Sequence, residues 1–228
     1  MDIVVLISAH AEWRAIQPLF PDTRMASSPF GEYFHAPFDT HPSARLTFFY
    51  GGWGKISAAA TTQYVIDHFH PKLLVNLGTC GGFAGHIQVG DILLVEKTIV
   101  YDILEQMGDA AAAIADYTTV LDLSWLSQPF PPGVQRGLLV SADRDIIPAD
   151  VPWLVQRFGA RAADWESGAI AWVAHKNRIP CLILRAVTDL VDSRGGEAYG
   201  NVDLFQQRTT AAMHRLWELF RHWLAALE

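Results

Sequence analysis

The sequence predicts one α/β domain with a mostly parallel sheet, and two observations carry this prediction. Short, β-branched, apolar runs alternate with helical stretches along the chain, an order typical of parallel sheets. These runs are apolar at successive positions, as expected of strands covered by helices on both faces. No linker, internal repeat or charge block divides residues 1–228, so we expect a single domain.

The individual elements follow from local patterns. Six apolar runs predict strands, at 3–8, 45–51, 72–78, 91–100, 136–142 and 181–187. Three stretches predict helices, at 55–70, 164–177 and 203–227. The last of these is amphipathic, and its apolar side comprises Leu216, Phe220, Trp223, Leu224 and Leu227. Residues 103–133 have the weakest pattern, in which AAAIA favours helix and QPFPPG favours a loop.

Composition narrows the classes of function. The 228 residues are 50% hydrophobic and 18% charged, enough for one sizeable core. A net charge of −7, with scattered basic residues, argues against nucleic-acid and membrane partners. The apolar runs are far shorter than the roughly 20 residues of a spanning helix, and MDIVVLISAHAEW lacks signal-peptide features. Cys80 and Cys181 lie in apolar contexts typical of reduced thiols, so we expect a cytoplasmic protein; a single disulfide is the alternative.

Polar and glycine residues cluster where the predicted strands end. The tails are SAHAEW, GGWGK, GTCGG, VYD, SADRD and RAVTDLVD. In open α/β sheets, ligands bind beyond the carboxyl ends of the strands. We therefore expect the functional site at this edge.

Cofactor and metal motifs are weak in this chain. GGWGKIS partly matches a dinucleotide fingerprint, but Ser57 replaces the last glycine and no acid ends a second strand about 20 residues on. In GTCGG, glycines let backbone amides approach a ligand and Thr79 adds a hydroxyl. Cys80 has no neighbouring histidine to activate it, so we interpret it as a packed small hydrophobe. The histidines lack metal-ligand spacing, and we expect neither metal nor cofactor.

Several charged residues have a purely structural interpretation. Asp164 would be a helix N-cap and Glu166 an acid of the first turn, stabilised by the helix dipole. Asp189 and Asp192 would cap the loop after their strand. Arg185 is harder to explain, because a charge inside an apolar run needs a partner.

Taken together, several segments resemble the purine nucleoside phosphorylase/uridine phosphorylase superfamily, in its nucleosidase branch. They are SAHAEW, GGWGKISAA, VNLGTCGGFAGHIQVGDILLVEKTIVYD, RGLLVSADRDI and ADWESGAIAWVAHKNRIPCLILRAVTD, in the family's order over residues 1–192. The resemblance implies a three-layer α/β/α sandwich around a twisted, mixed, mostly parallel sheet. It also implies hydrolysis of the N-ribosidic bond of a purine nucleoside of the methylthioadenosine or S-adenosylhomocysteine type.

The resemblance further implies roles for particular residues. Asp189 matches the general acid at purine N7, and Glu12 matches the acid that activates the attacking water. Arg185 and Thr79 match groups that position this water; we expect Arg185 to point to Glu12 rather than to Asp189, whose pKa it would lower. Glu166 matches the carboxylate that holds the ribose hydroxyls. The other expected substrate contacts are Trp165, in place of a methionine against the sugar, with Gly81, Asp145, Ile146 and Thr188.

Departures from the family pattern leave alternatives open. Asn76 stands where hexameric phosphorylases carry an arginine, and Glu12 would repel phosphate, so hydrolysis is favoured over phosphorolysis. Asp145 stands where nucleosidases carry an aromatic residue that stacks on adenine; it or Arg144 would read another base edge or face solvent. Futalosine-type or other modified purine nucleosides are alternative substrates, and a non-catalytic nucleoside-binding protein is an alternative function. The branch is commonly homodimeric, so we expect a homodimer.

Overall fold

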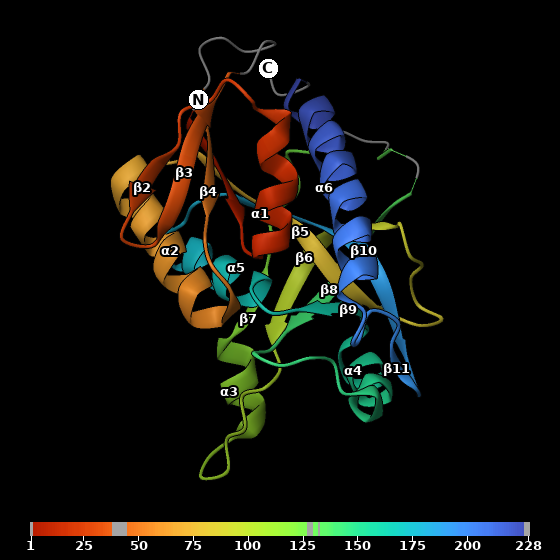
Figure 1. The fold of residues 1–228 in the computed structure, drawn as a ribbon. Helices are drawn as coiled ribbons and strands as arrows, with labels where there is room; N and C mark the ends of the chain where they lie inside the picture. The colour runs from red at the N-terminus through yellow and green to blue at the C-terminus, as the bar shows by residue number, and fades with distance from the viewer. Residues whose placement is uncertain (1, 38–44, 127–129, 132, 226–228) are drawn as a thin grey trace.

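The computed structural model describes residues 2–37, 45–126, 130–131 and 133–225 (Figure 1). Its strands are β1 (Asp2–Ile7), β2 (Ala26–Ser28), β3 (Gly31–Ala36), β4 (Arg45–Tyr50), β5 (Leu73–Phe83), β6 (Ile92–Val100), β7 (Thr118–Val120), β8 (Val134–Ser141), β9 (Ala160–Asp164), β10 (Cys181–Asp192) and β11 (Gly195–Gly196). Its α-helices are α1 (His10–Ile16), α2 (Gly54–Phe69), α3 (Ala110–Asp116), α4 (Val151–Phe158), α5 (Ser167–Lys176) and α6 (Val202–Ala225). Short 3₁₀ turns occupy Gln17–Leu19 and Pro148–Asp150.

The strands form one mixed sheet in the order β11-β10-β6-β8-β9-β5-β1-β4-β3-β2, with β7 beside β6. Parallel pairs join β4, β1, β5 and β10 in that order, and also β6, β8 and β9. Antiparallel pairs join β10 to β6 and β5 to β9. Because β10 pairs with both β5 and β6, the strands β5, β10, β6, β8 and β9 close into a ring. The expected mixed sheet is confirmed, and this closure brings distant strand ends to one place.

Helices cover the sheet on both sides, as expected for an α/β/α sandwich (Figure 1). Helices α2 and α5 contact each other on one side, while α1 and α6 pack together on the other. Helix α6 lies on β10 and β5, and buries the predicted apolar side chains Leu216, Phe220, Trp223 and Leu224. Leu227, predicted on the same side, lies outside the described residues. No helix in the described ranges is long and apolar enough to cross a membrane.

The predicted elements are present, but two strands run further than expected. β5 and β10 pair in parallel as far as Phe83 and Val191, so GTCGG and RAVTD lie within strands rather than in the tails that follow them. The register shifts between Val187 and Asp189. Such a bulge redirects side chains and is common beside active sites. It sets the position of Asp189 at the end of the β5–β10 pair.

Other elements were not anticipated from the sequence. Strand β9 has the sequence ARAAD, whose alanines favour helix; pairing with β8 and β5 overrides that preference. The run AAAIA does form helix α3, as expected, whereas QPFPPG falls partly outside the described residues. Cys80 and Cys181 are both free and buried, which confirms the interpretation as reduced thiols.

Candidate active site

A cavity of about 410 Å³ opens where β1, β5, β8, β9 and β10 end. It lies at the edge of the sheet that the polar strand tails predicted. Every predicted site residue except Arg185 lines it. These residues are Glu12, Thr79, Gly81, Asp145, Ile146, Trp165, Glu166, Thr188 and Asp189. The closed ring of strands therefore gathers segments that are far apart in the sequence.

Glu12 is fixed at the N-terminus of α1. Its Oε1 accepts hydrogen bonds from the backbone N–H of Thr79 at 2.6 Å and from the Thr79 hydroxyl at 2.8 Å. Its Oε2 accepts a bond from the backbone N–H of Ala9 at 3.1 Å, which caps the helix. The side chain is 2% exposed. Thr79 thus holds Glu12, and its expected role in positioning water stays a prediction.

Glu166 precedes α5 and is held from across the cavity. The backbone N–H of Gly54, at the start of α2, donates to its Oε1 at 3.0 Å. Burial, followed by the charge of Asp164, raises the pKa of Glu166 to about 8, although Arg185 opposes this. At neutral pH, the protonated form of Glu166 is therefore favoured.

Trp165 stacks on a second indole, Trp53, which the sequence reading missed. The ring centroids are 4.9 Å apart at 28°, and Trp53 is 66% exposed. Both rings line the cavity beside Glu166. In the sequence, GGWGK was considered only for its glycines, as a weak dinucleotide motif and a strand tail, so Trp53 was given no role.

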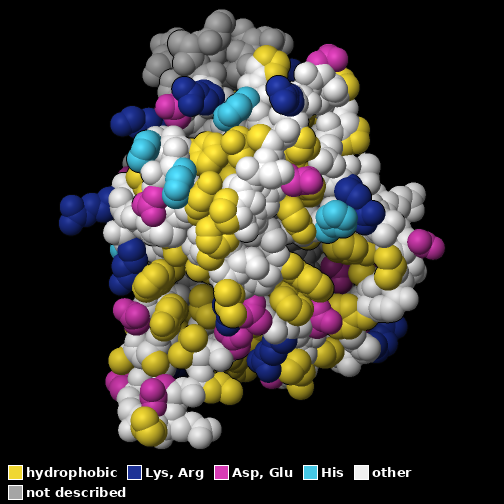
Figure 2. All heavy atoms as spheres, turned by 60° about the vertical axis from the view of Figure 1, so that its left-hand side comes forward, with side chains coloured by type: hydrophobic (Ala, Val, Ile, Leu, Met, Phe, Trp, Pro, Cys, Tyr) yellow, Lys and Arg dark blue, Asp and Glu magenta, His cyan; other side chains and the backbone are white. Residues whose placement is uncertain are grey.

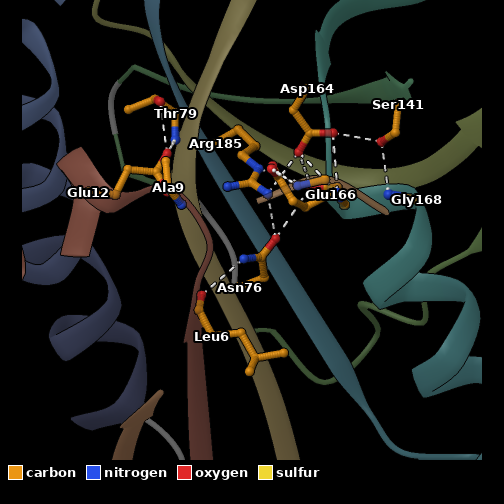
Figure 3. A network of polar contacts seen from close by, with 12 residues as sticks. Leu6, Ala9, Glu12, Asn76, Thr79, Ser141, Asp164, Glu166, Gly168 and Arg185 are labelled. Atoms are coloured by element: carbon orange, nitrogen blue, oxygen red, sulfur yellow. Dashed lines mark hydrogen bonds and ion pairs between the residues drawn. The ribbon is translucent and has the colours of Figure 1, made fainter. Parts of the chain in front are cut away.

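Arg185 forms its ion pair with Asp164, a partner that the sequence did not predict, whereas it was expected to point to the water and Glu12 rather than to Asp189. The guanidinium is fully buried, and its Nη2 lies 2.7 Å from Asp164 Oδ2. It also donates to the Ser167 hydroxyl at 2.9 Å and to Asn76 Oδ1 at 2.6 Å (Figure 3). The structure corrects the interpretation of Asp164 as the N-cap and of Glu166 as an acid of the first turn. Asp164 ends β9 and Glu166 is the N-cap residue of α5, although the Asp164 carboxylate accepts the Ser167 backbone N–H. A strand-end acid already inside the core gives the buried cation a closer partner than Glu12.

Glu12 nonetheless lies on the other side of the same arginine. A Cβ placed at Gly78 would come within 1.7 Å of Arg185 Nη1 and 2.9 Å of Glu12 Oε1. Residue 78 must therefore be glycine, because a side chain there would overlap the Arg185 guanidinium and the Glu12 carboxylate. The charges of Asp164 and Glu12 both raise the pKa of Arg185 against the effect of burial.

The ion pair is anchored by a wider polar network, visible in Figure 3. The Ser141 hydroxyl donates to Asp164 Oδ1 at 2.6 Å and accepts the Gly168 backbone N–H at 2.8 Å. On the opposite side, Asn76 Nδ2 donates to the Leu6 carbonyl at 3.0 Å. The roles of Ser141 and Ser167 were missed, since small hydroxyl residues beside strand ends carry no distinctive sequence signal.

Asp189 follows the bulge in β10 and is 7% exposed. Burial raises its pKa and Glu197 adds to this, whereas a hydrogen bond from Thr188, the charge of Arg208 and the backbone N–H of Ala198 lower it. Arg208 is occupied by the Thr188 carbonyl and by Glu197, each at 2.8 Å. Asp192, three residues on, binds the backbone and side chain of Arg194, which confirms its interpretation as a loop cap.

Residues 144–146, in the 143–146 loop, form a further wall of the cavity. Ile146 is buried, and its Cδ1 would lie 2.7 Å from a Cβ at Gly81, so glycine there admits the isoleucine. Arg144 pairs with Asp150 at 2.8 Å and lies 5.2 Å above the Tyr101 ring. Asp145 is exposed and makes no hydrogen bond or ion pair with other described residues. Asp145 is thus the freer of the two groups expected to read a base edge.

A charged cluster outside the predicted set connects two walls of the cavity. The Lys55 ammonium binds Asp102 and lies 3.8 Å from Asp143. The backbone N–H of Lys55 donates to Asp143 at 2.7 Å, and that of Asp143 donates to Asp102 at 3.1 Å. The start of α2, which holds Glu166, is thereby tied to the 143–146 loop.

The chain belongs to the phosphorylase superfamily, whose family model matches residues 26–224. It is similar to a 5′-methylthioadenosine/S-adenosylhomocysteine nucleosidase of Buchnera aphidicola, with 30% identity over 153 residues, 62% of this chain and 65% of that relative. A nucleosidase of the same name from Anoxybacillus flavithermus is 27% identical over 187 residues, 77% of this chain and 78% of the relative.

Solved structures share the fold. The nucleosidase of that name from S. pneumoniae, with a transition-state inhibitor, superposes with a TM-score of 0.80 at 22% identity, covering 100% of both chains. The corresponding Neisseria meningitidis protein, in complex with methylthio-immucillin-A, gives a TM-score of 0.80 at 21% identity over 99% of both chains.

The raised pKa of Glu166 predicts a pH-dependent stability. Folded Glu166 keeps its proton up to about pH 8, whereas unfolded glutamate loses it near 4.5. Its contribution to stability is therefore present at low pH and falls as pH rises between these values, by up to about 1.4 kcal/mol per pH unit. Urea unfolding from pH 5.5 to 8 should show a shallower slope in Glu166→Gln than in wild type. Glu105→Gln, in a surface loop, is the control, and identical slopes in wild type and Glu166→Gln would refute the shift.

Proposed function

We propose that the protein hydrolyses the N-ribosidic bond of a purine nucleoside, releasing the free base and the ribose moiety. The observation that carries this proposal is that Glu12, Glu166 and Asp189 line one cavity from three separate segments. Nucleoside hydrolysis needs a general acid for the base, an anchor for the sugar and a base for water. The nucleosidase names of the relatives agree with this chemistry.

Asp189 acts as the general acid. Its raised pKa, caused mainly by burial, favours the proton that this role requires. As the bond between C1′ and N9 breaks, its electron pair moves onto the purine, and Asp189 transfers its proton to N7. General acid catalysis of this kind typically contributes about 10²–10⁴-fold.

Glu12 acts as the general base. A water molecule forms the new bond to C1′ and gives a proton to the Glu12 carboxylate, so Asp189 ends deprotonated and Glu12 protonated until solvent restores both. Oε2 accepts one hydrogen bond, from Ala9, and keeps acceptor capacity for water. Thr79 positions Glu12, and the neighbouring Arg185 guanidinium stabilises the charges around it.

Glu166 binds the ribose hydroxyls, with Trp165 against the sugar. Hydroxyl donors favour the carboxylate form, so substrate binding lowers the pKa of Glu166 from its value in the empty cavity. The resulting negative charge lies near the positive charge that develops on the sugar. Glu166 and Asp189 therefore hold opposite protonation states at the moment of cleavage.

Water is a better co-substrate than phosphate for this cavity. Five acids line it, and Arg144, the one Lys or Arg among the described lining residues, is paired with Asp150. A phosphate anion needs a cradle of free cations. Asn76, in place of the phosphorylase arginine, is occupied by Arg185. These charges support hydrolysis over phosphorolysis.

The substrate we propose carries a 5′-thio substituent, as in 5′-methylthioadenosine or S-adenosylhomocysteine. This assignment rests on the names of the relatives. Futalosine-type and other modified purine nucleosides are the alternatives, because Asp145 takes the place of an adenine-stacking ring. We also propose one cytoplasmic domain over residues 1–228, supported by the single sheet and the free cysteines.

We further propose that the protein is a homodimer. Large apolar side chains are exposed on α2, on β7 and in the loop before α3, and Figure 2 shows hydrophobic side chains spread over this side of the molecule. They include Trp53, Ile56, Leu104, Met107 and Val120. Exposed apolar surface of this kind marks an interaction site.

The dimer is tested by light scattering after size exclusion. The wild type should have twice the mass of the chain, and Ile56→Asp, which places a charge at an 84% exposed position of this surface, should shift it to the monomer. Trp153→Asp on α4, outside the surface, is the control. A monomeric wild type at micromolar concentration contradicts the proposal.

The proposed chemistry predicts a selective loss in Asp189→Asn. The variant keeps the size of the side chain but has no carboxylic proton to donate, so base release should fall by about 10²–10⁴-fold. The measurement is turnover of purine nucleosides in phosphate-free buffer, with Tm recorded alongside. Asp192→Asn, at the end of β10 and outside the cavity lining, should stay near wild type. Unchanged turnover in Asp189→Asn would overturn the assignment.

A further inference from the structure

Tyr199 reaches over the cavity from the segment between β11 and α6. Its ring packs on the backbone of Gly196, where a Cβ would lie 2.6–2.9 Å from three ring atoms. Its hydroxyl donates to the Ile146 carbonyl at 2.9 Å, and the ring lines the cavity. The ring is thus held between the backbone of Gly196 and the cavity.

The surroundings of Tyr199 place it on the base side of the site. Ile146, whose carbonyl accepts the Tyr199 hydroxyl, lies beside Asp189, since a Cβ at Gly81 would be 2.7 Å from Ile146 Cδ1 and 3.8 Å from Asp189 Oδ1. Burial first, then the charges of Asp145 and Asp189, raises the pKa of Tyr199 to about 12, which agrees with this position. Its neighbour Ala198 also lines the cavity, and the Ala198 backbone N–H lowers the pKa of Asp189. The exposed indole pair, by contrast, adjoins Glu166 and therefore the sugar.

We infer that Tyr199 is the aromatic wall on which the purine base stacks, supplying from the 195–200 segment the ring that position 145 lacks. This inference rests on the proposed function, since that function puts the base beside Asp189. The hydroxyl tether to Ile146 fixes the ring to the 143–146 loop, and Gly196 gives it room. Tyr199 is a specificity-determining residue that binds base without taking part in proton transfer.

The inference is tested by comparing ring loss with hydroxyl loss. Tyr199→Ala should raise KM for a purine nucleoside by about tenfold, because the base loses its aromatic stacking partner. Tyr199→Phe keeps the ring and should stay within about threefold of wild type. Neither should change kcat as much as KM, because protonation of N7 is untouched. Tyr117→Ala is the control, since Tyr117 is an exposed tyrosine stacked on Trp172 and does not line the cavity.

A rescue variant separates stacking from a structural effect. Asp145→Phe restores a ring at the neighbouring position, so the double variant with Tyr199→Ala should recover most of the lost affinity. Phe205 also lines the cavity and offers the competing ring. A wild-type KM in Tyr199→Ala, or a loss found in Phe205→Ala instead, overturns the inference.

Binding of free adenine distinguishes this inference from the proposed function. If the wild type releases no base from any nucleoside, the proposed function fails. Calorimetric titration with adenine still tests whether the purine base stacks on Tyr199. Adenine should bind Tyr199→Ala about tenfold more weakly than wild type or Tyr199→Phe. Equal affinity for all three proteins overturns the role of Tyr199 even where turnover is normal.

Discussion

The ion pair between Arg185 and Asp164 organises the catalytic end of this fold. A guanidinium buried in the middle of a strand needs an anion, and removing one partner of such a pair typically destabilises a protein by about 3–5 kcal/mol. The ion pair joins Arg185, in β10, to Asp164 at the end of β9. Ser167 and Asn76 complete the hydrogen bonds of the arginine. The same contacts fix the start of α5 and so the position of Glu166. The geometry of the site therefore depends on the contacts that neutralise the buried charge of Arg185.

The acids around Arg185 differ in their distance from its charge and in the effect of burial on them. Asp164 is its direct partner, while Glu12 lies beside its other nitrogen. Asp189 projects from the bulge, where burial dominates and raises its pKa. Glu166 is raised as well, because burial and the charge of Asp164 outweigh Arg185. Carboxyl groups that differ in protonation within one cavity are what acid and base catalysis on the same bond requires.

Much of this arrangement follows from the sequence, and the rest depends on long-range pairing. Apolar runs predicted the main strands, and the polar ends of these runs predicted the edge that carries the cavity. The partner of Arg185 was missed because ARAAD has the local composition of a helix and becomes a strand only between β8 and β5. Trp53 and Tyr199 were missed because their roles depend on glycine-containing loops, whose conformation is set by contacts far along the chain. The residue types at the strand ends predicted the chemistry of the site. The contacts between particular residues, such as Arg185 and Asp164, became clear only from the structure.

The identity of the sugar product tests the central claim of hydrolysis most directly. Phosphorus NMR follows a reaction in which a purine nucleoside and inorganic phosphate are both saturating, while the released base and reducing sugar are quantified. Hydrolysis gives equal amounts of base and reducing sugar and leaves the phosphate signal unchanged, because water attacks C1′ beside Glu12. A sugar 1-phosphate signal that grows with the released base would contradict it.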